Sequence, residues 1–195
     1  MTSIRKFSRN KLAVGLFGSN CDGGLACSTF PERWEASWDN CRELAVQADN
    51  AGIDFMLPLG RWIGYGGDTD HNGSNFETIA WASGLLAATK NIMAFGTVHV
   101  TAHSPAVAAK QMVTADHIGG GRFGLNIVCG WYQKEFDMLG VDLGEHERSR
   151  ARRASHRRGR LGGRGHRQAA WAGRGLGSAS ARRRPRRGQA RPIGA

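Results

Sequence analysis

The chain has 195 residues, and its formal charge of +11 and pI near 10.5 at first suggest a nucleic-acid-binding protein. The charge is not spread evenly along the chain. Residues 1–147 hold 11 Lys and Arg against 16 Asp and Glu, whereas residues 148–195 hold 16 Arg, no Lys and no acidic residue. The first 147 residues are therefore acidic overall, which argues against nucleic-acid binding by that part of the chain.

No segment of the sequence indicates export or a membrane span. Residues 1–10 are polar and basic and lack the apolar core of a signal peptide. A run of about 18 apolar residues, as a membrane helix needs, does not occur. The cysteines show no C-x-x-C metal spacing, so we interpret them as reduced thiols: Cys21, Cys27, Cys41 and Cys129. We expect a cytoplasmic protein with no membrane partner.

Short apolar runs alternate with helical patterns from residue 12 onward. Residues 12–17 (LAVGLF) predict a strand, which the loop sequence Gly18-Ser19-Asn20 follows. A helix is expected to begin at Pro31 and to end at the C-cap Gly52. Its buried face is expected to hold Trp34, Trp38, Cys41, Ala45 and Ala48.

The next elements are a second strand and a second helix. Residues 53–57 (IDFML) predict the strand, and a glycine-rich loop over residues 60–73 follows it. Ser74 and Glu77 match a capping box, in which both side chains bond to the first turn of a helix. The apolar face of this helix is expected to hold Ile79, Ala82, Leu85 and Leu86.

A third strand is predicted over residues 92–98 and a fourth over residues 122–128, with a helix that begins at Ser104-Pro105 between them. Four strands that alternate with three helices predict a parallel sheet with right-handed crossovers. No dinucleotide or Walker glycine motif follows the first strand, so we favour a (β/α)₈ TIM barrel over an open α/β sheet. Such barrels typically need about 250 residues, so residues 1–147 are expected to supply the first half of one.

Residues 148–195 form a separate region by composition. Their large apolar residues are Leu161, Trp171, Leu176 and Ile193, which are too few to offset chain entropy, so we expect a disordered tail. Arg, Gly and Ala have GC-rich codons, and we favour an out-of-frame translation of a GC-rich gene as the origin. The alternative is an arginine-rich arm that binds nucleic acid through phosphates, against which the absence of Lys, Tyr and Phe weighs.

Several motifs of the first region occur together in one known family. They are DFMLPLGRWIGYGG (residues 54–67), KQMVTADHIGGGRFGLNIVCGW (110–131), GGLACST (23–29) and PAVAAK (105–110). In this order they make the chain resemble the bacterial luciferase-like flavin-dependent monooxygenases. Within that family it is most similar to the pyrimidine and dimethyl sulfone monooxygenases and more distantly to alkanesulfonate monooxygenase. The likeness extends over residues 11–146 and is expected to stop where the composition changes.

The resemblance implies a TIM-barrel enzyme that uses reduced FMN and O₂ to oxygenate a small organic sulfur or nitrogen compound. It also implies a separate NAD(P)H-dependent flavin reductase as partner and a homo-oligomer for the full-length protein. Carried over by position, Gly60 and Arg61 would lie near the isoalloxazine ring. Thr97 and Asn126 would be the catalytic residues that face the ring and the oxygen site. Glu135 would be a further flavin contact.

The residue types suit these roles, although each also has a plainer interpretation. Hydroxyl and amide groups can hydrogen-bond to flavin ring atoms without charging the site. Asn126 interrupts an apolar strand, where a buried amide needs partners. Against this, Thr97 is also a β-favouring residue, and Arg61 is also compatible with an ordinary surface position. Glu135 is also typical of the first turn of a helix.

Two further features lie near these residues. His99 and His103 are spaced like a metal pair, but the segment between them leaves a strand and no third ligand is placed, so no metal site is expected. A position of His99 near the mouth of the flavin site is the alternative. The loop over residues 60–73, with Trp62 and Tyr65, is expected to cover the site against water.

Three functions from different classes remain open. The first is an FMNH₂-dependent monooxygenase, expected to be weakly active or inactive because phosphate sites of TIM barrels are frequently built after strands 7–8. The second is a non-catalytic half-barrel with a basic tail. The third is a nucleic-acid-binding protein led by residues 148–195. Flavin binding separates the first from the others.

Overall fold

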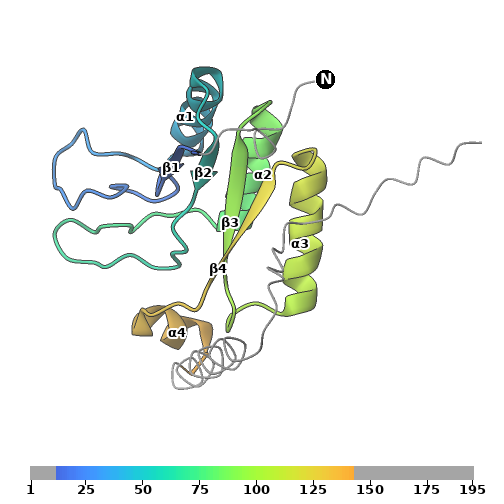
Figure 1. Cartoon of the computed structure of the whole chain (residues 1–195). Helices are drawn as coiled ribbons and strands as arrows, with labels where there is room; N and C mark the ends of the chain where they lie inside the picture. Colours follow the sequence, from blue (N-terminus) through green and yellow to red (C-terminus); the bar gives the residue numbers. More distant parts are fainter. Residues whose placement is uncertain (1–11, 143–195) are drawn as a thin grey trace, which may run out of the picture. The chain divides into compact units, whose positions relative to one another are not determined.

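The computed structural model describes residues 12–142. Its elements alternate along the chain as β1 (Gly15–Phe17), α1 (Trp38–Ala51), β2 (Phe55–Leu57), α2 (Thr78–Ala88), β3 (Met93–His99), α3 (Pro105–Ile118), β4 (Phe123–Val128) and α4 (Gln133–Leu139). The strands form one parallel sheet in the order β1-β2-β3-β4, as Figure 1 shows. The predicted parallel α/β arrangement is confirmed. The arginine-rich tail and the boundary placed after residue 147 lie outside the described residues.

One face of the sheet is covered by helices. Successive strand residues point to opposite faces. Met56 of β2 and its register partner Ala94 of β3 belong to the main hydrophobic core, together with buried residues of α1 and α2. Val98 of β3 packs with Ile79 of α2 and Ala115 of α3 in a second cluster. This face therefore corresponds to the outer, helix-covered face of a TIM barrel.

The opposite face is aromatic near its middle. The rings of Phe55 and Phe95 pack edge to face with their centroids 5.6 Å apart. Glycine in β4 makes room for one of them, because a Cβ on Gly124 would lie 2.6 Å from the Phe95 ring. Toward the carboxyl ends of β3 and β4, this face carries the polar side chains of Thr97, Asn126 and His99.

Two buried charged side chains hold the amino-terminal edge of the sheet. Asp49, near the end of α1, accepts hydrogen bonds from the backbone N–H groups of residues 90–92. Arg122, just before β4, donates to three carbonyl oxygens within residues 86–92 and to the Thr89 hydroxyl. Together they satisfy the backbone groups that α2 leaves free as the chain turns into β3, and so fix that turn.

The start of the first helix differs from the expectation. It was predicted at Pro31, but α1 begins at Trp38, with the Ser37 side chain as N-cap. Trp34 therefore lies in a loop, where its indole N–H donates to a backbone carbonyl across that loop. The end of the helix is confirmed, since Gly52 adopts the left-handed conformation with φ 87°.

The capping box predicted for the second helix is wrong. The N-cap of α2 is Glu77, whose carboxylate accepts hydrogen bonds from the N–H groups of Ile79 and Ala80. Ser74 lies before the helix because its carbonyl accepts a hydrogen bond from the N–H of Asp22 in the preceding loop. A tertiary contact thus keeps this stretch extended.

Within the described part of the chain, no helix is long and apolar enough to cross a membrane.

Candidate active site

The carboxyl edge of the sheet carries a chain of hydrogen bonds that joins three strands. Thr97 in β3 and Asn126 in β4 are register partners. The Asn126 amide nitrogen donates to Thr97 Oγ1 over 3.2 Å, and Thr97 Oγ1 donates to the carbonyl oxygen of Pro58, just after β2, over 3.1 Å. Ligands of parallel α/β proteins bind at this edge, because the loops that follow the strands converge there.

The two side chains of this pair differ in what they leave for a ligand. Thr97 is 3% exposed, and its hydroxyl is already donor and acceptor. Asn126 is partly exposed, and its Oδ1 and one of its N–H groups have no partner among the described residues. Both side chains are neutral, so Asn126 can bond to a ligand without adding a charge to the site.

Gly60 brings the segment after β2 close to β3. A Cβ at this position would lie 2.7 Å from Thr97 Cγ2 and 3.1 Å from His99 Cε1. A larger residue would therefore force these side chains apart, and the close approach needs glycine. This contact places Gly60 beside the Thr97–Asn126 pair.

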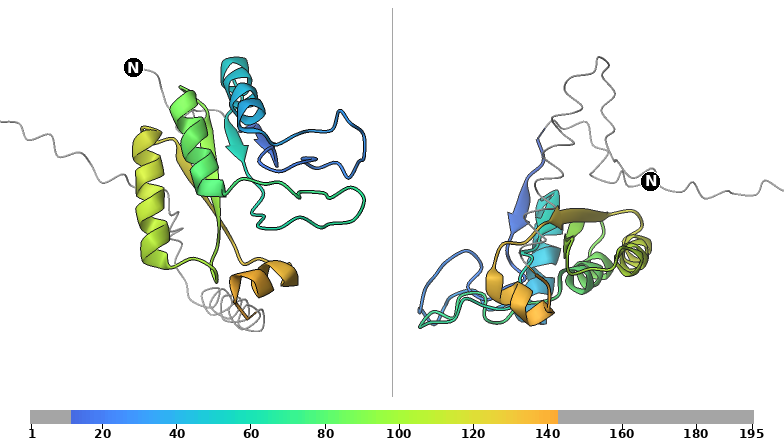
Figure 2. Two further views of the ribbon diagram at one scale, coloured as in Figure 1. Left: turned by 180° about the vertical axis from the view of Figure 1, so that it is seen from behind. Right: turned by 90° about the horizontal axis from the view of Figure 1, so that it is seen from below.

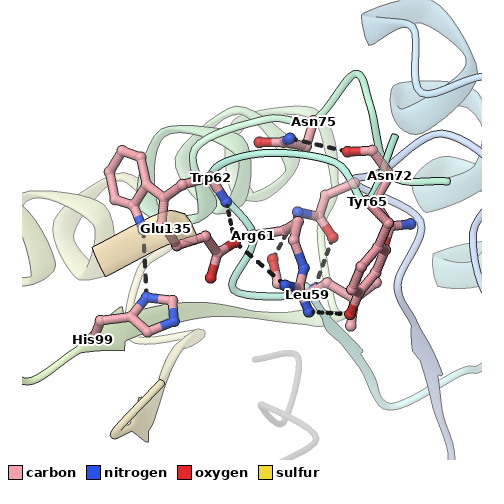
Figure 3. Close-up of polar contacts among 9 residues, drawn as sticks. Leu59, Arg61, Trp62, Tyr65, Asn72, Asn75, His99 and Glu135 are labelled. Atoms are coloured by element: carbon pink, nitrogen blue, oxygen red, sulfur yellow. Dashed lines mark hydrogen bonds and ion pairs between the residues drawn. The ribbon is translucent and has the colours of Figure 1, made fainter. Parts of the chain in front are cut away.

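Arg61 and Glu135 form a buried ion pair next to this group (Figure 3). Arg61 Nη1 and Glu135 Oε1 are 3.4 Å apart, and the side chains are 7% and 3% exposed. The same carboxylate oxygen accepts a hydrogen bond from the backbone N–H of Trp62 over 2.8 Å. This further hydrogen bond helps to stabilise the buried carboxylate. The pair fastens the loop after β2 to α4, a helix that the sequence patterns did not predict.

Aromatic rings surround the Arg61 guanidinium. Its Nη2 donates to the Tyr65 hydroxyl over 2.7 Å. The guanidinium carbon lies 4.7 Å from the centroid of the Tyr65 ring, 5.3 Å from that of Trp131 and 5.5 Å from that of Tyr132, which are cation–π distances. Arg61 Nε is buried and has no hydrogen-bond partner among the described residues.

His99, the last residue of β3, is buried beside the ion pair. Its Nδ1 accepts a hydrogen bond from the indole Nε1–H of Trp62 over 3.4 Å. Burial lowers the pKa of the His99 imidazole below its ordinary value; His103 and Arg61 act in the same direction and Glu135 opposes them. The imidazole is therefore neutral at neutral pH.

Two loops that follow β1 and β2 lie side by side in Figures 1 and 2 and are fastened by asparagines. The fully buried Asn20 accepts a hydrogen bond from the N–H of Leu59 and donates to the Leu59 carbonyl, over 2.8 and 3.0 Å. Asn72 donates to two carbonyl oxygens of the first loop over 3.1 and 3.2 Å. Asn20 thereby fixes the stretch that leads from β2 into the site.

The structure brings the predicted site residues to one edge of the sheet: Gly60, Arg61, Thr97, Asn126 and Glu135. The loop expected to cover the site contacts it through Trp62 and Tyr65. Sequence reasoning missed Asn20. A signal for it existed, because a polar residue just after the first apolar run stands at the carboxyl end of a strand.

The fold is that of part of a TIM barrel, a class of protein that binds ligands at the carboxyl ends of its strands. A family model described as luciferase-like monooxygenase matches residues 17–192. The chain belongs to this family, as the motifs indicated. The match continues past residue 146, where the likeness was expected to stop.

Curated relatives include pyrimidine monooxygenases. The chain is 32% identical over 134 residues to pyrimidine monooxygenase RutA of Agrobacterium fabrum (strain C58 / ATCC 33970). This alignment covers 69% of this chain and 37% of the relative. It is 30% identical over 148 residues to RutA of Shigella flexneri, an alignment that covers 76% of this chain and 39% of the relative. The chain thus spans less than two fifths of the length of these relatives.

Two solved crystal structures share the fold. DmoA from Hyphomicrobium sulfonivorans superposes with a TM-score of 0.61 at 16% identity, covering 75% of this chain and 34% of that one. Riboflavin lyase (RcaE) superposes with a TM-score of 0.58 at 24% identity, covering 68% of this chain and 33% of that one. The predicted TIM-barrel class is confirmed, and the described residues supply part of the barrel.

Proposed function

We propose that this chain binds FMN at the carboxyl edge of its sheet and serves the FMNH₂-dependent oxygenation of a small nitrogen- or sulfur-containing compound. The observation that carries the proposal is the hydrogen-bonded chain from Pro58 through Thr97 to Asn126. It sets neutral polar groups across the strand ends where this fold binds ligands. The identity to pyrimidine monooxygenases supports a flavin and favours a planar nitrogen heterocycle as substrate.

The residues of this edge fit a flavin in two respects. Asn126 has an acceptor and a donor without partners, which match the mixed acceptors and donors along the isoalloxazine edge. Arg61 Nε is a buried donor without a partner, and such a group is stabilised when a ligand supplies an acceptor. Bound reduced flavin would supply the reaction with O₂, while the protein supplies orientation and polarity.

Within this proposal, Thr97 holds the Asn126 amide in place, and that amide orients the ring. Arg61 and Glu135 are proposed flavin contacts. Their ion pair holds the loop over residues 60–73 against α4. A separate NAD(P)H-dependent reductase would supply FMNH₂, as the resemblance to the family implies. This supply fits a cytoplasmic location, and we propose a homo-oligomer for the complete protein.

Titration of the purified full chain with FMN tests the proposal. Quenching of flavin fluorescence should give a Kd well below the millimolar range. Arg42→Met, a substitution on the exposed side of α1 and away from the site, should bind FMN as well as the unsubstituted chain does. Uracil with NADH and a flavin reductase then tests turnover. No quenching up to millimolar FMN would overturn the proposal, and binding without turnover would leave a non-catalytic flavin protein.

A further inference from the structure

His99 occupies a slot between two glycine backbones. On one side, a Cβ on Gly60 would lie 3.1 Å from His99 Cε1, and on the other, a Cβ on Gly130 would lie 2.8 Å from His99 Cδ2. Gly130 also has φ +78°, a conformation that favours glycine. The Nε2 atom lies between Cε1 and Cδ2 in the ring. It therefore faces the gap between the segments that follow β2 and β4.

Trp62 determines which ring nitrogen of His99 carries the proton. An indole N–H is a donor only, and that of Trp62 meets His99 Nδ1, as Figure 3 shows. Nδ1 must therefore present its lone pair, and the proton of the neutral imidazole lies on Nε2. No described residue accepts a hydrogen bond from Nε2, so this N–H is open to a ligand.

The groups that face the ring keep it neutral rather than cationic. His99 is 5% exposed, and the charged Arg61 and the ionisable His103 both disfavour a second positive charge. Glu135 is the acidic group that acts on the ring, and its Oε1 atom is already shared between Arg61 and the Trp62 N–H. A neutral N–H donor suits a carbonyl oxygen or an unprotonated ring nitrogen, acceptors that flavins and pyrimidines both carry.

We propose that His99 is a further hydrogen-bond donor of this site, presenting Nε2–H to a carbonyl oxygen or ring nitrogen of the bound flavin or substrate, with Trp62 as its positioning residue. The identity of the ligand rests on the proposed function. The Nε2–H form is a property of this chain without any ligand, and it is measured separately.

The first experiment records long-range ¹H–¹⁵N correlation spectra of the full chain with ¹⁵N-labelled histidine at pH 7.5. The His99 signals are identified by their absence from the His99→Gln spectrum. They should show the neutral Nε2–H form. In Trp62→Phe, which removes the indole donor, a mixture of both neutral forms should replace it. An Nδ1–H form or an imidazolium in the unsubstituted chain would overturn the proposal.

The second experiment compares two amide variants by FMN titration and, with FMN bound, by uracil titration. In His99→Gln the amide nitrogen can take the place of Nε2, whereas in His99→Asn it takes the place of Nδ1. We expect His99→Asn to weaken binding about 10-fold and His99→Gln to retain most of the affinity. If His99→Asn weakens FMN binding, the acceptor of the His99 hydrogen bond lies on the flavin. If it weakens only the binding of uracil, the acceptor lies on the substrate.

Equal affinities of both variants and the unsubstituted chain in both titrations would overturn the role of His99. Equal losses in both variants would also overturn it, because they would indicate packing rather than the donor. Failure of the unsubstituted chain to bind FMN would overturn the proposed function and the ligand assignment together. The tautomer spectrum would then still decide whether the chain presents Nε2–H.

Discussion

A single hydroxyl oxygen, Thr97 Oγ1, serves two hydrogen bonds at the candidate site. Thr97→Val keeps the shape of the side chain but leaves the Pro58 carbonyl and the Asn126 amide without it. The free energy of unfolding should fall by about 1–3 kcal/mol, and FMN affinity should fall as the amide loses its orientation. Urea unfolding and flavin titration measure the two effects.

Thr97→Ser is the matched control, because it keeps Oγ1 and removes only the methyl group. It should bind FMN nearly as well as the unsubstituted chain. If Thr97→Ser weakens binding and Thr97→Val does not, the methyl contact with Gly60 matters and the hydroxyl does not.

The lowered pKa of His99 predicts a pH dependence of stability. In the unfolded chain the imidazole takes up a proton near its ordinary pKa of about 6.5, whereas in the folded chain it does so only at lower pH. Below about pH 6.5 the unfolded state therefore binds more protons, and the free energy of unfolding decreases as the pH falls. Above that pH the effect is absent.

His99→Gln removes the pH-dependent contribution of the imidazole to the free energy of unfolding. Urea unfolding at several pH values between about 7.5 and 5 should show the unsubstituted chain losing more stability than the variant. Parallel decreases in the two proteins would contradict the prediction, since they would arise from other titrating groups.

The site residues differ in how visible they are in the sequence. Asn126 stands out because an amide interrupts an apolar strand, Gly60 lies in one of the family motifs, and Thr97 follows from its position at the end of the third predicted strand. The orientation of His99 could not be predicted, because it depends on Trp62, which arrives from a loop. The course of that loop is fixed by Glu135, 73 positions later in the chain.

At the scale of elements, the strands were predicted within a few residues because each is a short apolar run. The starts of α1 and α2 were not, because tertiary contacts decide them. The hydrogen bond between the Asp22 N–H and the Ser74 carbonyl extends the chain before α2. The helix α4 has only seven residues and no strong periodicity, and it is held by the contact of Glu135 with Arg61.

The turn between α2 and β3 depends on Arg122. Arg122→Met removes four hydrogen bonds and leaves buried carbonyl groups without partners. We expect the free energy of unfolding to fall by about 2–4 kcal/mol. Arg42→Met, an exposed substitution on α1, should change it by less than about 0.5 kcal/mol. Thermal and urea unfolding of both variants measure the difference, and similar effects would contradict the role of this turn.

At the scale of the whole molecule, charge is divided sharply between two regions. Residues 148–195 hold 16 Arg and no acidic residue, whereas residues 1–147 have an excess of acidic over basic residues. The full chain should bind DNA weakly, and the affinity should fall steeply with salt. A chain without residues 148–195 should not bind DNA under the same conditions. Fluorescence anisotropy with labelled DNA measures both, and DNA binding that persists after the deletion would contradict the assignment of basicity to this region.

The two edges of the sheet carry separate sets of side chains. Asp49 and Arg122 act where the strands begin, and Thr97 and Asn126 act where they end. The first set lies at the opposite edge of the sheet from the candidate site, so substitutions there are expected to change thermal tolerance without changing the choice of ligand. In a directed-evolution experiment, changes that widen the range of accepted compounds should collect in residues 58–77 and after β4. Changes that compensate for lost thermal tolerance should collect around the turn before β3.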